Sequence, residues 1–390
     1  MSRLNVSNLF NENEDGAPVV SGISTFSSPN YFVPPSGSTA QRPSSPGEGM
    51  IRFNTDSGHL EYYTGTHWAD VIVNNNELGG GTGSNTGTGT RGLFAGGYAS
   101  SPLGVNNTID YITISTLGNA QDFGDLTNRR TEPAGASSRT RSVVMGGGVA
   151  PSNAAGNTID FVTIASTGDA TDFGDLLSNL RGAGSTGNRT RGICVGGITP
   201  GDSNVIQYVT IASTGNAVDF GDNSVIMNYA QAGQVGSSVR GIFGGAYTAG
   251  NSPNFKININ FVTIASTGNA QDFGDLTLAR GSLGAVGNST RAVFCGGYAS
   301  PAIKSNILDF ITIATTGNAQ DFGDLISGSS FVRGSCSSPT RGVTAGGYAP
   351  GISNRMEYIE ILSTGNSVDF GDMVNAGTNG AGCSNGHGGL

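Results

Sequence analysis

One segment occurs six times in this chain and constrains its fold more than any other feature. Its core is Asp-Phe-Gly-Asp, and the copies begin at Asp122, Asp172, Asp219, Asp272, Asp321 and Asp369. Successive copies therefore lie 47 to 53 residues apart. A period of this length is typical of architectures in which each repeat is one small structural unit that stacks on its neighbours. The sequence predicts six equivalent units between residues 91 and 390.

Each repeat has the pattern of four short β-strands. Residues 159–176 of the second repeat supply the last two, separated by the turn Ser166-Thr167-Gly168-Asp169. Before them come a small-residue segment and a strand that starts with Arg and ends in Gly-Gly. Large apolar residues lie on both faces of the third strand, so both faces should be covered. These features predict an all-β fold, a six-bladed β-propeller.

The order of these segments resembles the kelch repeat. The kelch Gly-Gly-Tyr is complete at Tyr98, Tyr298 and Tyr348, and it is altered in the other copies. Phe123 and its equivalents stand where kelch repeats usually carry Trp. The resemblance covers residues 80–390 and implies a kelch-like propeller.

The two ends of the repeat region are expected to complete one blade. The last Asp-Phe-Gly-Asp is followed by a small-residue segment, 380–386, with no Arg strand after it. The first Arg strand, 91–97, follows a Gly-rich stretch. We expect 380–386 to pair with 91–97, because propellers need protected edges. The alternative partner for 91–97 is residues 83–89.

The first 90 residues are expected to form three segments. Residues 1–46 are rich in Ser, Asn and Pro and predict an extended arm. Residues 47–76 predict a small three-stranded module that holds the single Trp and is too small to be stable alone. Residues 77–90 predict a Gly-rich linker to the propeller, which takes residues 91–390.

Two parts of the chain resemble bacteriophage proteins. Residues 47–71 are similar to the Gly-x-Ile-Arg-Tyr-Asn-Thr-Asp…Leu-Glu-Tyr-Tyr…Trp motif of phage tail-fibre and other appendage proteins. Repeats with Ser-Thr-Gly-Asn and Asp-Phe-Gly-Asp are similar to those in virion proteins of phages that infect marine cyanobacteria. The resemblances imply a virion location, with the arm bound to other virion proteins. A homo-oligomer, such as a trimer, is a further expectation for the N-terminal region.

Composition excludes several classes of partner. The net charge is -9, which argues against nucleic acid. No apolar run approaches the roughly 20 residues of a membrane span, so membrane insertion is not expected. Met1 leads into polar sequence, and no secretory signal is expected.

Internal variation points to one face of the propeller. The first and third turns of each repeat are nearly uniform, whereas the second turn and the connection between repeats vary in sequence and length. These variable loops should gather at one end, where recognition commonly occurs, although unconstrained drift explains the variation equally well. Candidate ligand-binding residues there, for sugars or anionic groups of a host surface glycan, are Tyr98, Tyr247, Phe255, Lys256, Tyr298, Lys304, Tyr348 and Arg355. The alternative for each Tyr is packing at the end of a blade.

The recurrent charged residues are expected to be structural. The Asp residues of the six segments are expected to cap turns or to pair with six Arg residues that recur in phase. A set of calcium sites is the less favoured alternative, because the spacing lacks the dense alternation of a calcium loop. The Arg residues are Arg91, Arg141, Arg191, Arg240, Arg291 and Arg341.

Neither the cysteines nor the histidines indicate catalysis. Four Cys residues lie at small apolar positions without a Cys-x-x-Cys pair, which favours inert thiols. His59, His67 and His387 all lie outside the repeats, so no His-ligated metal, catalytic residue or cofactor is expected.

Three classes of function follow. The favoured one is a non-enzymatic tail or head fibre that displays the propeller for adhesion to a host. The second is a structural decoration or cement protein without a host ligand. The third is a glycan depolymerase that uses two loop carboxylates.

Overall fold

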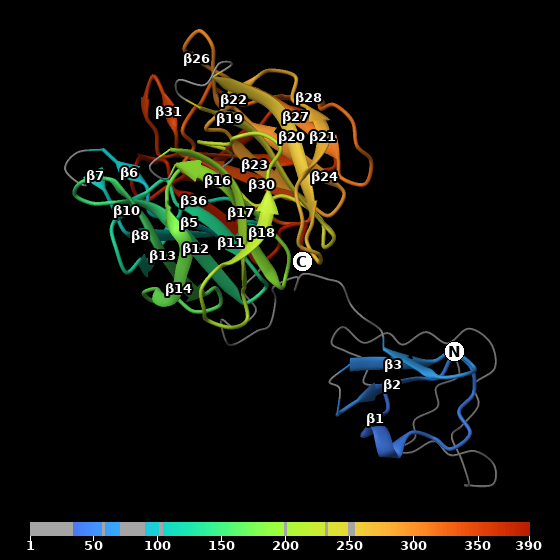
Figure 1. The fold of residues 1–390 in the computed structure, drawn as a ribbon. Helices are drawn as coiled ribbons and strands as arrows, with labels where there is room; N and C mark the ends of the chain where they lie inside the picture. Colours follow the sequence, from blue (N-terminus) through green and yellow to red (C-terminus); the bar gives the residue numbers. More distant parts are fainter. Residues whose placement is uncertain are drawn as a thin grey trace. The chain divides into compact units, whose positions relative to one another are not determined.

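The computed structural model describes residues 34–56, 59–70, 90–100, 104–198, 201–230, 233–248 and 254–390. Residue contacts divide the chain into two compact units, Met1–Asn75 and Asn76–Leu390, here called the smaller and the larger unit. Strands dominate both units, and the single helix in the described ranges is the 3-10 turn η1 (Thr39–Gln41), so the all-β prediction is confirmed (Figure 1). None of the described residues forms a helix long and apolar enough to cross a bilayer.

Each repeat of the larger unit contributes an antiparallel sheet. The sheets of repeats one to three are β36 (Ala381–Ser384), β5 (Arg91–Ala95), β8 (Thr108–Thr113), β9 (Gln121–Asp125); β11 (Ala134–Ser137), β12 (Arg141–Val149), β13 (Ala154–Thr163), β14 (Thr171–Leu180); and β15 (Gly184–Gly187), β16 (Arg191–Ile198), β17 (Asp202–Thr210), β18 (Val218–Asp222). Those of repeats four to six are β19 (Arg240–Tyr247), β20 (Phe255–Thr263), β21 (Gln271–Asp275); β23 (Gly284–Gly287), β24 (Arg291–Cys295), β27 (Ile307–Thr312), β28 (Gln320–Asp324); and β29 (Gly334–Ser337), β30 (Arg341–Ala345), β33 (Arg355–Glu360), β34 (Val368–Asp372). In repeat four an isolated bridge between Gly236 and Gly241 takes the place of the first strand.

Short strands lie on the side of the second turns. β10 (Arg130–Thr131) joins the sheet of repeat two by pairing with β12. The others form small separate sheets: β22 (Arg280–Gly281), β25 (Tyr298–Ala299) and β26 (Ile303–Lys304); β31 (Tyr348–Ala349) and β32 (Gly351–Ile352); and β35 (Gly377–Thr378), β6 (Tyr98–Ala99) and β7 (Gly104–Val105).

The C-terminal strand joins the first repeat. β36 pairs antiparallel with β5, with Ala381 opposite Ala95 and Ser384 opposite Gly92. β35 likewise pairs with β6. This is the pairing that the sequence favoured for residues 380–386. The alternative partner, residues 83–89, lies outside the described residues.

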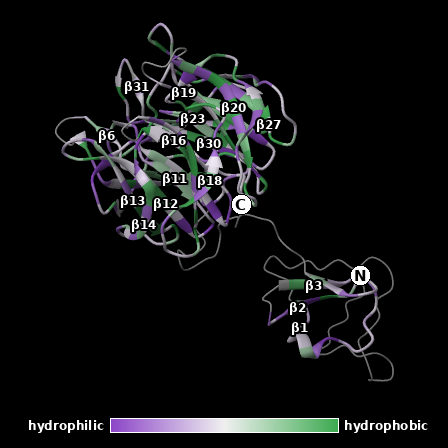
Figure 2. Cartoon of the chain, viewed as in Figure 1, coloured by the Kyte–Doolittle hydropathy of each residue, from purple (hydrophilic) through white to green (hydrophobic). Residues whose placement is uncertain are grey.

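The hydrophobic core lies between neighbouring repeats. Each cluster of buried apolar residues combines side chains of two successive repeats, for example Met145 and Phe173 of repeat two with Cys194 and Val209 of repeat three. One cluster combines Phe94 of repeat one with residues of repeat six. Both faces of the sheets are therefore covered, as the apolar residues on both faces of the third strand predicted. Figure 2 shows the hydrophobic residues along strands such as β20 and β27.

The Asp-Phe-Gly-Asp segments bond each repeat to the next. The N–H of the Gly in one Ser-Thr-Gly turn donates to the Phe carbonyl of the preceding repeat, at 2.7–3.0 Å. In the described part of the larger unit this contact occurs six times, and the sixth, from Gly118 to Phe370, joins repeat one to repeat six. The other donor–acceptor pairs are Gly168–Phe123, Gly215–Phe173, Gly268–Phe220, Gly317–Phe273 and Gly365–Phe322.

The recurrent Arg residues do not pair with these Asp residues, which corrects half of the structural prediction. Each guanidinium stacks 4.4–4.8 Å from an aromatic ring on the third strand of its own repeat. That ring meets the Phe of Asp-Phe-Gly-Asp edge-on, at 5.7–6.1 Å. The same Arg donates to an Ile carbonyl of the next repeat at 2.6–3.2 Å, and Arg341 of repeat six donates to Ile114 of repeat one. The Arg therefore acts as a link between repeats.

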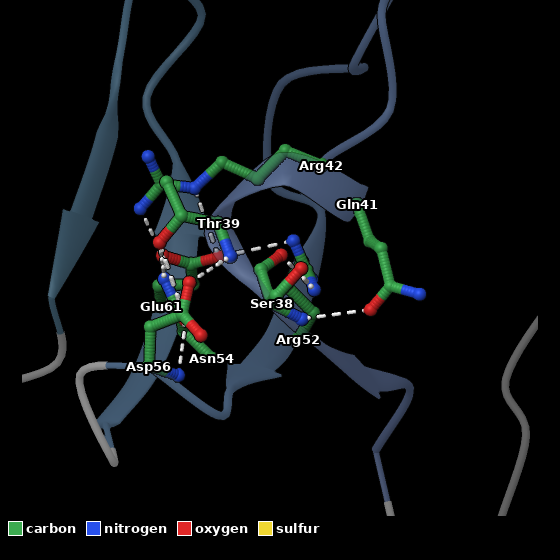
Figure 3. A network of polar contacts seen from close by, with 8 residues as sticks. All are labelled: Ser38, Thr39, Gln41, Arg42, Arg52, Asn54, Asp56 and Glu61. Atoms are coloured by element: carbon green, nitrogen blue, oxygen red, sulfur yellow. Dashed lines mark hydrogen bonds and ion pairs between the residues drawn. The ribbon is translucent and has the colours of Figure 1, made fainter.

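The smaller unit is a sheet in the order β1 (Ser36–Gly37), β2 (Ile51–Asn54), β3 (His59–Tyr63), β4 (Trp68–Asp70). β1 lies before residue 47, where the module was expected to begin. It nevertheless belongs to the module's sheet, because it pairs in parallel with β2. One face of the sheet buries a polar network centred on Glu61, which binds Arg42 and Arg52 (Figure 3). The opposite face exposes Ile51, Phe53 and Tyr62.

Candidate functional site

The strand register separates two ends of the larger unit. In repeat two, Ser138 bonds to Arg141 and Arg141 pairs with Thr163, which places the uniform first and third turns at the same end. The second turn and the connection to the next repeat lie at the other end, where β6, β7 and β10 also lie. The other repeats have the same register. We call these the uniform end and the variable end.

A closed cycle of backbone hydrogen bonds lies at the variable end. In the described residues, one backbone N–H in each repeat connection donates to a backbone carbonyl of the preceding connection at 2.7–3.0 Å. The cycle closes because the Glu132 N–H donates to the Asn379 carbonyl. All members have φ between 46° and 68°, a left-handed conformation that favours Gly. We call this cycle the connection ring; its members are Glu132, Gly182, Tyr229, Ser282, Phe331 and Asn379.

The connection ring surrounds a cavity of about 40 Å³. Glu132, Tyr229 and Phe331 all contribute to its lining. The Glu132 carboxylate lies 3.3 Å from the Arg181 guanidinium and accepts a hydrogen bond from the Tyr229 hydroxyl. Burial raises the pKa of Glu132, although Arg181 and Tyr229 act in the opposite direction. Burial, with the nearby Glu132 charge, raises the pKa of Tyr229 to about 12. The cavity wall thus has one carboxylate, whose charge the adjacent Arg181 balances, beside aromatic surface.

A continuous set of aromatic rings starts and ends at this cavity. Tyr229 lies 6.3 Å from Tyr247, which lies 4.9 Å from Phe255. Phe255 lies 5.5 Å from Tyr298, and Tyr298 lies 5.7 Å from Phe331. All of these side chains are half-buried. We call these five residues the aromatic arc; the sequence predicted Tyr247, Phe255 and Tyr298 but not its two ends.

The remaining predicted residues lie outside the arc. Tyr98 is exposed on β6 in repeat one. Lys304 lies 3.9 Å from the centre of the Tyr348 ring, so these two residues form a cation–π pair. Lys256 stands opposite Ala246 in the β19–β20 pair and is half-buried.

Arg355 belongs to a second cavity, of about 260 Å³, in repeat six. Its guanidinium lies 2.7 Å from Glu357 and also donates to Ser327. Glu357 in turn accepts from the Ser367 hydroxyl at 2.6 Å. Both charges are therefore already satisfied within the protein.

Buried ion pairs lie beneath the variable end. Arg130 and Asp160 are 2.6 Å apart, and Arg280 and Asp309 are 2.7 Å apart, with all four side chains at most 1% exposed. In repeats three and four an aliphatic residue stands at the position of the Arg and an amide at the position of the Asp. The pairs are Leu180 with Gln207 and Met227 with Asn260. A buried carboxylate thus occurs where a guanidinium accompanies it, as the cost of an unpaired buried charge requires.

Asp110 of repeat one obtains its partner from elsewhere in the chain. Gly377 occupies the position that corresponds to Arg130, and a Cβ there would lie 2.8 Å from the Arg333 side chain. Arg333, from the connection between repeats five and six, lies 3.3 Å from Asp110. Burial nevertheless raises the pKa of Asp110 to about 6.

The C-terminal residues cover the inner strands at the uniform end. His387 is buried, its Nε2 donates to the Ser137 carbonyl at 2.9 Å, and its Nδ1 accepts from the Gly389 N–H at 3.1 Å. A Cβ at Gly388 would meet Asn288 of repeat five and Gly236 of repeat four. Burial lowers the pKa of His387 to about 4. The tail is therefore packed against several repeats.

The Asp-Phe-Gly-Asp segments have contacts of their own. The N–H of the second Asp donates to an Asn or Asp side chain of the next repeat at 3.0–3.1 Å. Among the described residues, no three His, Cys, Asp or Glu side chains cluster as metal ligands. Cys194, Cys295, Cys336 and Cys383 are buried and unbridged.

Comparison with known proteins adds no relative. A scan against protein families finds no match for the chain, and a search of curated proteins finds none either. Any functional conclusion therefore depends on the residues themselves.

Proposed function

We propose that residues 91–390 form a closed, kelch-like six-bladed β-propeller in which each repeat is one blade. The support is that each kind of contact between successive repeats also occurs between repeat six and repeat one. These contacts are the Gly–Phe and Arg–Ile hydrogen bonds, the core clusters and the connection ring. A linear stack of repeats would leave the first and last without such contacts.

The propeller serves, in this proposal, as a non-enzymatic adhesion module of a phage virion, a tail or head fibre that binds a host-surface glycan. The observation that carries the binding role is the contrast between the two ends. The uniform end repeats the same turn in every blade, whereas the variable end carries half-buried aromatic rings around a cavity. Aromatic faces beside a few polar groups are typical of carbohydrate sites.

The N-terminal region is the proposed attachment segment. Its small sheet buries an ionic network and exposes the apolar residues Ile51, Phe53 and Tyr62, with Ile51 opposite Tyr62 in register. A sheet with so little apolar core gains stability when such a face is covered by another protein. Other virion proteins or further copies of this chain are the proposed partners.

The experiment is a binding assay with the purified full chain and intact host cells. We expect saturable binding that added host polysaccharide inhibits, and antibody labelling of the particle surface. Labelled particles without any binding to cells or polysaccharide would instead indicate a cement protein. Release of oligosaccharides from host polysaccharide would indicate an enzyme and contradict the proposal.

A further inference from the structure

The variable end is not equally suited to binding around its circumference. Aromatic rings in mutual contact occur over repeats four and five and their connections, where the aromatic arc lies. On the other side of the connection ring, between Phe331 and Tyr229, the members are Asn379, Glu132 and Gly182, which offer little apolar surface. A ligand that stacks on rings will therefore meet one sector of this end.

Two members of the arc occupy backbone positions that suit them poorly. Tyr229 has φ 46° and Phe331 has φ 53°, within the region where a bulky side chain is a conformational outlier. Gly182 fills the same position in another connection without that cost. Strained non-Gly residues of this kind concentrate at functional sites. The fold itself requires only the left-handed backbone, so the two rings need another reason.

The cavity indicates what the arc receives. Its volume of about 40 Å³ holds a few water molecules, and therefore accepts a hydroxyl or hydroxymethyl group and not a complete sugar ring. Glu132 provides a hydrogen-bond acceptor at its wall, and Arg181, 3.3 Å from that carboxylate, balances its charge. A neutral group rich in hydroxyls matches this lining better than a charged one.

We infer that the aromatic arc and the cavity form one site for a neutral oligosaccharide. The sugar rings stack on Tyr247, Phe255 and Tyr298, and the chain end places a hydroxyl-bearing group in the cavity beside Glu132. This inference rests on the proposed adhesion function and specifies its ligand class and its sector. Tyr98 and the Lys304–Tyr348 pair lie outside the site.

The test uses the full chain on an array of neutral and acidic oligosaccharides, and on host cells. We expect binding to neutral members that changes little between about 0.05 and about 0.5 M NaCl, because screening acts on charge pairs and not on stacking. Tyr298→Ala, and Tyr229→Asn, which keeps a residue tolerant of positive φ, should each weaken binding about tenfold or more. Leu362→Ala, at the uniform end, should leave it unchanged.

The outcomes distinguish this inference from the function on which it rests. If the chain binds host cells but Tyr98→Ala weakens binding as much as Tyr298→Ala, the site covers the whole variable end and the inference is wrong. Preference for acidic sugars, steep loss of binding with salt, or binding to a surface protein alone would also overturn it. Binding to neither cells nor glycans would refute the adhesion function itself. Unchanged melting temperatures in Tyr229→Asn and Tyr298→Ala would separate loss of contact from loss of fold.

Discussion

Closure of the repeats into a propeller can be tested with one methyl group. In every Asp-Phe-Gly-Asp segment the Gly faces the Ser-Thr-Gly turn of the next repeat. A Cβ at Gly371 would lie 2.5 Å from the Gly118 oxygen, and one at Gly274 would lie 2.5 Å from the Gly317 carbonyl carbon. Gly371 faces the junction of repeats six and one, whereas Gly274 faces an ordinary internal junction. Both have φ above 140°.

The expected cost of Gly→Ala is the same at both positions. The backbone conformation costs an Ala about 1–3 kcal/mol. The turn must also move away, which weakens the Gly118–Phe370 bond or its equivalent by about 1 kcal/mol. A total of about 3 kcal/mol, in a unit of about 300 residues with an unfolding entropy of roughly 0.6 kcal/mol/K, lowers the melting temperature by about 5 °C.

Differential scanning calorimetry of the full chain measures the effect. Gly371→Ala and Gly274→Ala should lower the melting temperature equally. Gly351→Ala is the matched control, because a Cβ there has no heavy atom within 4 Å. A drop for Gly371→Ala clearly smaller than that for Gly274→Ala, with only the backbone cost left, would mean that repeats six and one do not touch. The closed propeller would then be refuted.

Three further predictions concern buried groups. The pKa of His387 is depressed from 6.5 to about 4. The stability that the buried neutral imidazole contributes is therefore complete above pH 6.5 and is lost as the pH falls through 4. The loss should reach up to about 3 kcal/mol in the free energy of unfolding. Melting curves between pH 7 and 4 should show a steeper decline for the wild type than for His387→Ala, and equal slopes would contradict this. Arg280→Leu should cost about 3–5 kcal/mol in denaturant unfolding because it leaves Asp309 buried and charged, while adding Asp309→Gln should recover most of the loss; no recovery would show that packing dominates. Burial raises the pKa of Cys194 to about 12, so a thiol reagent at pH 8 should label it only after unfolding, and rapid labelling of the native chain would contradict its burial.

The repeat period and the four-strand pattern could be predicted because each is written several times in the sequence. The pairing of residues 380–386 with 91–97 followed from the absence of an Arg strand after the last repeat. The role of the recurrent Arg was harder to predict from the sequence. Its aromatic partner, Tyr111 in repeat one, recurs in phase with it, but the acidic residues offered a more obvious partner.

The connection ring carries no signal that a single sequence can reveal. Its members are defined by backbone dihedral angles and hydrogen bonds, and Glu132, Gly182, Tyr229, Ser282 and Phe331 share no side-chain chemistry. The cavity, and the two ends of the aromatic arc, were missed for the same reason. In the smaller unit, Ser36–Gly37 was expected to belong to an arm, because two residues are too short to show a strand pattern.

The pairing of Asp110 with Arg333 bears on how such a chain can evolve. Tandem repeats commonly change in number by recombination between copies. Here the acid of the first repeat depends on a base from the connection that leads into the last repeat, so an exchange that puts an internal copy in place of either would leave a buried charge without its partner. The first repeat and the connection into the last must therefore diverge together.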